Sequence, residues 1–163
     1  MAKRMIVFLA AVLAGTHVFG AVTNLSQCVG IELTAAVLAE FPERDNSSPE
    51  ACVLGFVKGS VSGDFSVFLT PLSDDLREEE AGVSDLSMLT PAMTNDFLAF
   101  VTGAAFSNHV VQSHSAAVSQ NEATVEFSMC SQSGMLVKTN RMQATLLGTG
   151  NEWRITAWDV DDQ

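Results

Sequence analysis

The sequence has no tyrosine and little positive charge, with 8 Lys and Arg residues against 19 Asp and Glu residues. Its formal net charge is −11 at pH 7. A protein that binds nucleic acid needs a basic stripe to neutralise phosphates, and no stretch of this chain supplies one. We therefore exclude nucleic acid as a partner.

The chain also lacks an apolar run long enough to cross a membrane as a helix. The longest run, Met5 to Ala14, has about ten residues, whereas a bilayer needs about twenty. Two basic residues, Lys3 and Arg4, precede it, and a short stretch from Gly15 to Gly20 follows it. This order is typical of a secretory signal peptide. We expect residues 1–20 to be cleaved, the protein to be exported to the periplasm or the exterior, and no membrane span to remain.

A lipoprotein is the less favoured alternative to a freely released protein. The segment from Leu25 to Cys28 loosely resembles the sequence ahead of a lipidated cysteine. However, Gln27 is too large for its position in that sequence, and Cys28 lies well past the apolar run.

Cysteine is scarce, and the three cysteines form no metal motif. Cys28, Cys52 and Cys130 lie far apart, and neither His109 nor His114 is adjacent to one of them. We therefore predict no metal site and no cofactor. Because Cys52 lies on the apolar stripe of a predicted helix, we expect it to be a buried free thiol. Any disulfide must then join Cys28 to Cys130.

The length of 163 residues and the hydrophobic content of 47% predict one globular domain. Residues 21–47 are expected to be an N-terminal segment and linker, and residues 48–163 the domain. The apolar piece at residues 29–41 fits either a strand or a helix.

Capping residues and apolar periodicity predict three helices. Between the second and third, the acidic run at residues 74–80 is interpreted as a solvated loop or a frayed helix end. The first expected helix spans residues 48–63. The second begins at Asp64 and bends or ends at Pro71, and the third spans residues 84–104 with a break at Pro91.

From residue 108 onward the hydrophobic period changes to two, which predicts β-strands joined by short turns. The predicted fold class is α+β, with about three N-terminal helices packed in a strongly curved four-stranded antiparallel sheet, a cone or half-barrel. The expected strands are Asn108 to Ser119, Glu122 to Ser131, Met135 to Leu147 and Glu152 to Val160.

Several short motifs, in this order, resemble the nuclear transport factor 2-like superfamily, whose cone is also called cystatin-like. They are Ser48-Pro49-Glu50 with Phe56, Gly63-Asp64, Ala123 to Val125, and the closing run Gly150 to Ile155. The nearest resemblance is to small exported bacterial domains of unknown function. The resemblance implies a pocket inside the cone but no particular reaction. Isomerases of the superfamily use a tyrosine phenol, which this chain lacks.

Strand alternation indicates which side chains face the inside of the expected cone. We predict a mostly apolar pocket lined by Phe97, Phe127, Met129 and Met142. The polar residues of this pocket are Gln112 and His114, whereas His109 is expected to face outward.

The sequence leaves two functions from different classes open. The first is a domain that binds a small apolar or amphipathic ligand or a partner protein without catalysis. That partner could be a second copy on the sheet face, where Trp158 and Leu147 are expected to point outward. The alternative is an acid/base enzyme of the dehydratase, isomerase or cyclase type. His114 would be its base and Asp96 the carboxylate that orients it.

Overall fold

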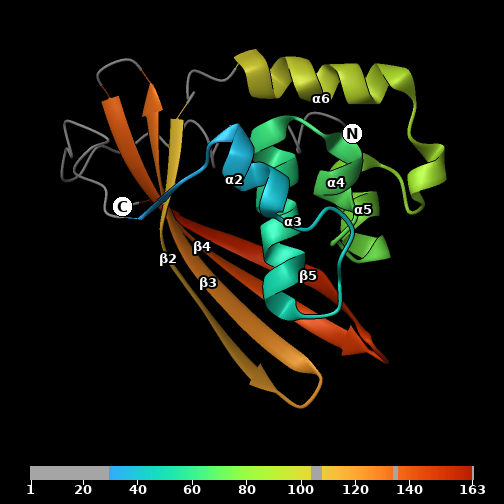
Figure 1. Ribbon diagram of the computed structural model, residues 1–163. Helices are drawn as coiled ribbons and strands as arrows, with labels where there is room; N and C mark the ends of the chain where they lie inside the picture. The colour runs from blue at the N-terminus through green and yellow to red at the C-terminus, as the bar shows by residue number, and fades with distance from the viewer. Residues whose placement is uncertain (1–29, 104–107, 134–135, 163) are drawn as a thin grey trace.

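The computed structural model describes residues 30–103, 108–133 and 136–162. The predicted signal peptide and Cys28 lie outside these ranges. The fold is α+β, as expected, with helices packed on one face of a curved antiparallel sheet (Figure 1). The described residues form five α-helices and five strands, so the predicted three helices and four strands were too few.

The ambiguous N-terminal piece contains both a strand and a helix. β1 (Ile31–Glu32) is followed by α2 (Ala35–Glu40), whose first turn is capped by the hydroxyl of Thr34. β1 pairs with β2 at the edge of the sheet. This part of the expected linker region therefore belongs to the same sheet as the domain.

The next two helices begin at the predicted capping residues, and the first of them also ends at its predicted glycine. Ser48 caps α3 (Pro49–Ser62), which ends at Gly63 with a φ of 74°, a conformation that favours glycine. The carboxylate of Asp64 caps α4 (Phe65–Leu69). The chain thus turns at Gly63 and packs α4 closely against α3.

The acidic run is a helix, so its interpretation as a loop or frayed end was wrong. α5 (Asp74–Ala81) is capped by Ser73 and ends at Gly82. Asp74 and Asp75 lie in the first turn, where negative side chains interact favourably with the helix dipole.

Proline begins the last helix. A short 3-10 helix (Leu86–Met88) precedes α6 (Pro91–Gly103). The first turn of a helix has no use for the missing proline N–H, so Pro91 is well placed there. The break expected at Pro91 within residues 84–104 thus separates two elements.

The four long strands lie where the alternation predicts them. They pair antiparallel in chain order, β1-β2-β3-β4-β5, and a parallel bridge between Leu72 and Ile155 continues the sheet beyond β5. The strands are β2 (Asn108–Ser119), β3 (Glu122–Ser133), β4 (Leu136–Thr149) and β5 (Glu152–Asp162).

A bulge in β5 reverses the predicted orientation of Trp158. The register shifts so that Thr145 pairs with Ala157 and Leu146 with Ile155, which leaves Thr156 as the extra residue. Trp158 therefore faces the helices, with its ring centroid 4.8 Å from that of Phe56. The prediction of an outward Trp158 was wrong.

A second bulge lies at Gln112 in β2 and has the same effect on His109. Val111 pairs with Met129 and Ser113 with Ser128, so Gln112 has no partner. His109 pairs with Ser131 and is only 7% exposed. The prediction that His109 faces outward was also wrong, because regular alternation does not continue through a bulge.

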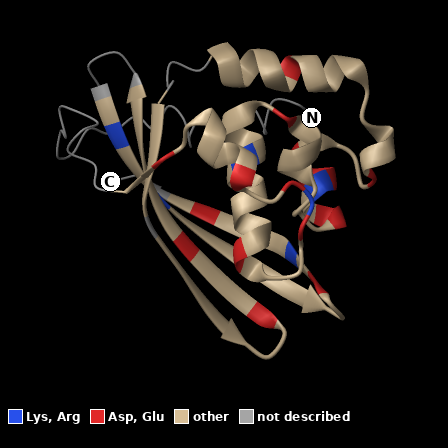
Figure 2. Ribbon diagram, viewed as in Figure 1, with Lys and Arg blue, Asp and Glu red and all other residues tan. Residues whose placement is uncertain are grey.

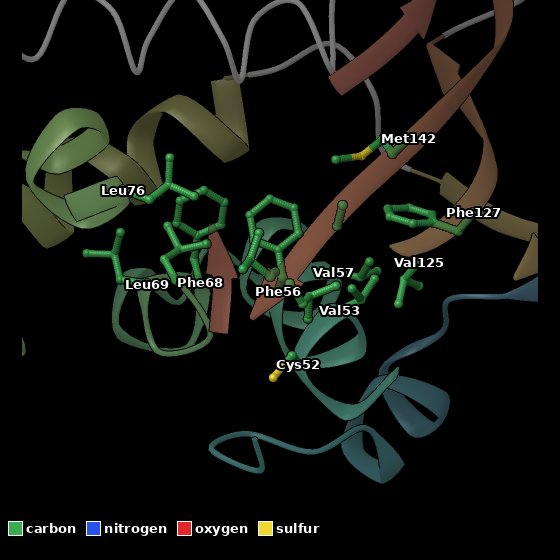
Figure 3. Packing of buried hydrophobic residues seen from close by; sticks show 14 of the residues in the cluster. Cys52, Val53, Phe56, Val57, Phe68, Leu69, Leu76, Val125, Phe127 and Met142 are labelled. Carbon is green, nitrogen blue, oxygen red and sulfur yellow. The ribbon is translucent and has the colours of Figure 1, made fainter. Parts of the chain in front are cut away.

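The core fills the space between the helices and the inner face of the sheet. Figure 3 shows side chains of α3, including Val53, Phe56 and Val57, near Val125 and Phe127 of β3. The rings of Phe65 and Phe97 stack with centroids 4.6 Å apart, which joins α4 to α6.

Candidate functional site

The apolar residues of the predicted pocket are packed in the core. Phe97, Phe127, Met129 and Met142 are each between 2% and 4% exposed and belong to one hydrophobic cluster. Packing takes up nearly all of their surface. The apolar pocket expected among these four residues stays a prediction.

The polar residues of the predicted site are exposed. Gln112 lies at the β2 bulge, Asp96 lies on α6, and His114 pairs with Phe127 across β2 and β3. Directly paired residues share a face of the sheet, so His114 is on the helix side, as expected. The assignment of His114 as a base oriented by Asp96 stays a prediction.

The described surface is hollowed over strands β2, β3 and β4. The hollow has a volume of about 250 Å³ and adjoins a second of about 180 Å³, and both include Glu126 and Arg141. We call the two together the outer groove. Its lining residues are His114, Ser115, Glu126, Phe127, Ser128, Thr139, Arg141, Gln143 and Asp159.

Most of these residues lie on the face of the sheet that points away from the helices. On β3, Glu126 and Ser128 alternate with the buried Val125 and Phe127. Arg141 pairs with Ser128 across β3 and β4 and therefore shares its face. The same register places Gln143 opposite Glu126, and Asp159 on β5 opposite Gln143. The outer groove thus crosses four neighbouring strands.

Glu126 is the centre of the hydrogen bonds in the groove. A guanidinium nitrogen of Arg141 donates to one carboxylate oxygen at 2.6 Å, and the Gln143 amide donates to the other at 3.0 Å. The bond and charge of Arg141, followed by the bond from Gln143, hold the pKa of Glu126 below its usual value. Glu126 is therefore ionised at neutral pH and holds two side chains of β4 in place.

Asp159 contributes a second carboxylate to the groove. It is exposed, and one of its oxygens accepts the backbone N–H of Val160 at 2.9 Å. No lysine or arginine of the described residues forms an ion pair with it. Among the described side chains, the groove thus contains one ion pair, Glu126 with Arg141, and one carboxylate, Asp159, that belongs to no ion pair.

A second polar cluster lies at the far end of the sheet. The Nδ1 atom of His109 and the hydroxyl of Ser131 are 2.8 Å apart, and both side chains are buried. Burial lowers the pKa of His109, so the ring is neutral at neutral pH. A serine and a neutral histidine have the chemistry of a nucleophile and its base. However, Ser131 is only 1% exposed, so its hydroxyl is not open to a substrate.

Sequence reasoning missed both the outer groove and this buried pair. The groove depends on cross-strand register, since Glu126 is 15 residues from Arg141 and 17 from Gln143. The His109–Ser131 pair depends on the bulge at Gln112. No glycine or proline in β2 indicates that bulge.

The described residues contain neither a metal-binding cluster nor a membrane-spanning helix. In residues 30–103, 108–133 and 136–162, no three His, Cys, Asp or Glu side chains are grouped so that they could hold a metal ion. No helix in the same part of the chain is long and apolar enough to cross a membrane.

The structure confirms the prediction for Cys52, which is a free thiol with no exposed surface. Cys130 is disulfide-bonded. Its predicted partner, Cys28, lies outside the described residues, so the Cys28–Cys130 pairing stays a prediction.

Comparison with solved structures finds a likeness in fold. Neither a protein family nor a curated protein matches the sequence. The structure is similar to the solution structure of a SEC-C motif containing protein from Rhodopseudomonas palustris, with a TM-score of 0.51 and 15% identity. The match covers 73% of this chain and 83% of the other. At this identity the likeness concerns the fold alone.

This finding overturns the resemblance to the nuclear transport factor 2-like superfamily, including its cystatin-like cone. The structural match is to a SEC-C motif protein instead. The residues that suggested the superfamily are helix caps and turns, such as Ser48, Gly63 and Asp64. Such residues begin and end helices in many folds, so they do not specify one of them.

Proposed function

We propose that this protein is a noncatalytic binding domain that holds a polar, positively charged segment of a partner protein in the outer groove. The observation that carries the proposal is the pair of adjoining hollows on one sheet face, joined by Glu126 and Arg141. Export, as expected from residues 1–20, would place this domain outside the cytoplasm.

The size and lining of the groove favour a protein segment over an enclosed small molecule. Small-molecule pockets usually measure about 300–1,000 Å³ and have mostly apolar walls. The larger hollow is about 250 Å³, and Phe127 is the single large apolar residue in its lining. The other lining residues offer hydroxyl, imidazole, guanidinium and carboxylate groups. A small amphipathic ligand would find little apolar surface there.

The charge of the groove indicates the kind of segment. Glu126 is already bonded to Arg141, so the carboxylate of Asp159 is the group available to a cation. The chain as a whole carries a net charge of −11, which attracts basic partners over longer distances. A partner segment fits both the carboxylate of Asp159 and the negative net charge if its lysine or arginine reaches Asp159. The backbone of that segment would lie near Ser115 and Ser128.

Titration of isotope-labelled protein with a short lysine–serine peptide tests the proposal, with amide NMR shifts as the measurement. We expect saturable shifts at Ser115, Glu126, Arg141 and Asp159. A matched glutamate–serine peptide should produce none. Asp159→Asn should weaken the shifts several-fold, because it removes the carboxylate without changing the size of the side chain.

A matched control uses the acidic face of α5. Glu78 and Glu79 are exposed carboxylates outside the groove, and Glu78→Gln with Glu79→Gln removes more charge than Asp159→Asn. If binding is only long-range attraction, the α5 variant should weaken it more. That result, or shifts centred on α5, would refute the proposal.

A further inference from the structure

Strand β2 is paired along its whole length on one side, but only over a short stretch on the other side. β3 pairs with it from Asn108 to Ser119, with the one irregularity at Gln112, whereas β1 pairs only with Val110 and Val111. Beside residues 113–119, no strand of the described residues lies on that second side. Figure 1 shows β2 at the outside of the long β2–β3 hairpin.

The turn after β2 determines which backbone groups this edge presents. Gln120 and Asn121 form a two-residue connection between Ser119 and Glu122, and such a connection closes on a hydrogen-bonded pair. Hydrogen-bonded and non-hydrogen-bonded pairs alternate along an antiparallel ladder. The N–H and C=O groups that point away from β3 are therefore those of His114, Ala116 and Val118.

This edge lacks the residues that usually prevent an edge strand from pairing with another strand. Natural edges carry charged residues or proline, and β2 has no Asp, Glu, Lys, Arg or Pro in its twelve residues. Residues 114–119 are exposed, and Val118 is 55% exposed. Figure 2 shows β2 without charged residues, whereas β3 and β4 carry them.

The absence of charge favours a second copy of this chain as the partner. Two copies of a chain with a net charge of −11 repel each other, and β2 is the one long strand of the described sheet that can approach its own copy without opposing like charges. We propose that two copies of this chain associate through the β2 edge, as an antiparallel strand pair across a two-fold axis.

The stretch of β2 that no other described strand covers on this side fixes the register of this pair. Residues 113–119 are centred on Ala116, so the two-fold axis places Ala116 opposite the same residue of the second copy. His114 then lies opposite Val118 of that copy, and all three outward-pointing residues can exchange backbone hydrogen bonds. β1 pairs with Val110 and Val111, and Gly30 lies against Val111 and Gln112, so both border the pair without overlapping residues 113–119. An interface of this length is small, so association should be weak and concentration-dependent.

Two opposite charge substitutions at Ala116 test this register. Ala116→Lys and Ala116→Glu each place like charges opposite each other at the axis, and each should weaken self-association at least tenfold. An equimolar mixture of the two variants should associate again, because lysine then lies opposite glutamate. Sedimentation equilibrium over a wide range of protein concentration measures all three samples.

Ala92 on α6 provides the control, since it is also exposed. Ala92→Lys and Ala92→Glu make the same changes in net charge and should leave self-association unchanged. Circular dichroism verifies that every variant is folded. A wild-type protein that is monomeric at all concentrations, or a mixture that fails to associate, would overturn the proposal. The measurement involves no basic peptide, so its outcome is independent of the outer groove.

Discussion

The thiol of Cys52 donates a hydrogen bond to the backbone carbonyl oxygen of Trp153, 3.1 Å away and 101 residues later in the chain. The same thiol lies 3.4 Å from the side-chain oxygen of Asn46, whose backbone carbonyl accepts the N–H of Trp153. Cys52 thus joins α3 to the start of β5 and to the segment before α3. Burial, which is the largest cause, raises its pKa to about 12.

We predict that Cys52 does not react with a thiol reagent such as Ellman's reagent while the protein is folded. At pH 8 a thiol with a pKa of about 12 is ionised in roughly one molecule in ten thousand, and burial also blocks access. Rapid reaction under native conditions would show that the thiol is open to solvent.

The same reagent tests the disulfide. In denaturant without a reductant, we expect one reactive thiol per chain, because Cys130 is disulfide-bonded and Cys52 is free. After reduction, all 3 cysteines should react. Peptide mapping without reduction should find Cys130 linked to Cys28, and a bridge that contains Cys52 would contradict both assignments.

Gly59 and Gly55 on α3 form a matched pair for a stability measurement. A Cβ atom at Gly59 would lie 2.2 Å from the backbone nitrogen of Phe68, so Gly59→Ala requires α3 and α4 to move apart. We expect a loss of about 1–3 kcal/mol in the free energy of unfolding. At Gly55 the nearest atom is the Pro42 carbonyl oxygen, at 3.5 Å, which is ordinary contact. Gly55→Ala should be neutral or stabilising by up to about 1 kcal/mol.

Urea unfolding of the two variants provides the comparison. Equal losses of stability would mean that the close approach of α3 and α4 at Gly59 has no energetic effect beyond that of a changed glycine.

Local signals in the sequence were sufficient to predict much of the fold. Ser48, Gly63 and Asp64 act through hydrogen bonds and backbone conformations within a few residues, so their capping roles could be read without tertiary information. The alternation of the long strands is equally local. The break at Pro91 is local as well, because proline suits the first turn of a helix but not its interior.

The candidate site could not be predicted in the same way, because it depends on register between strands. A bulge changes the face of every later residue, as His109 and Trp158 show. Glu126 meets Arg141 and Gln143 only because β3 and β4 pair in one particular register. No local pattern distinguishes these side chains from other exposed polar residues.

The expected signal peptide leads to a prediction about the N-terminus. Cleavage after Gly20 leaves small or acceptable residues at both recognition positions, so the exported protein should begin at Ala21. N-terminal sequencing or intact mass measurement of exported protein checks this. A lipid-modified N-terminus at Cys28 would instead establish the lipoprotein and would contradict the Cys28–Cys130 disulfide.

The buried His109 makes stability depend on pH. Burial lowers its pKa below the ordinary value of 6.5, so the unfolded chain binds a proton at a higher pH than the folded protein does. Its contribution to stability is therefore complete above about pH 6.5 and is lost as pH falls towards the folded pKa. The slope for one group is at most about 1.4 kcal/mol per pH unit.

His109→Gln should remove this dependence, because glutamine can still hydrogen-bond to Ser131 and does not titrate. We expect the free energy of unfolding of the wild-type protein to fall between pH 7.5 and 5.5, and that of the variant to fall less. Urea unfolding at several pH values measures both. His114→Gln is the control, because His114 is exposed and its substitution should preserve the wild-type slope. A slope that His109→Gln leaves unchanged would mean that other groups cause the pH dependence.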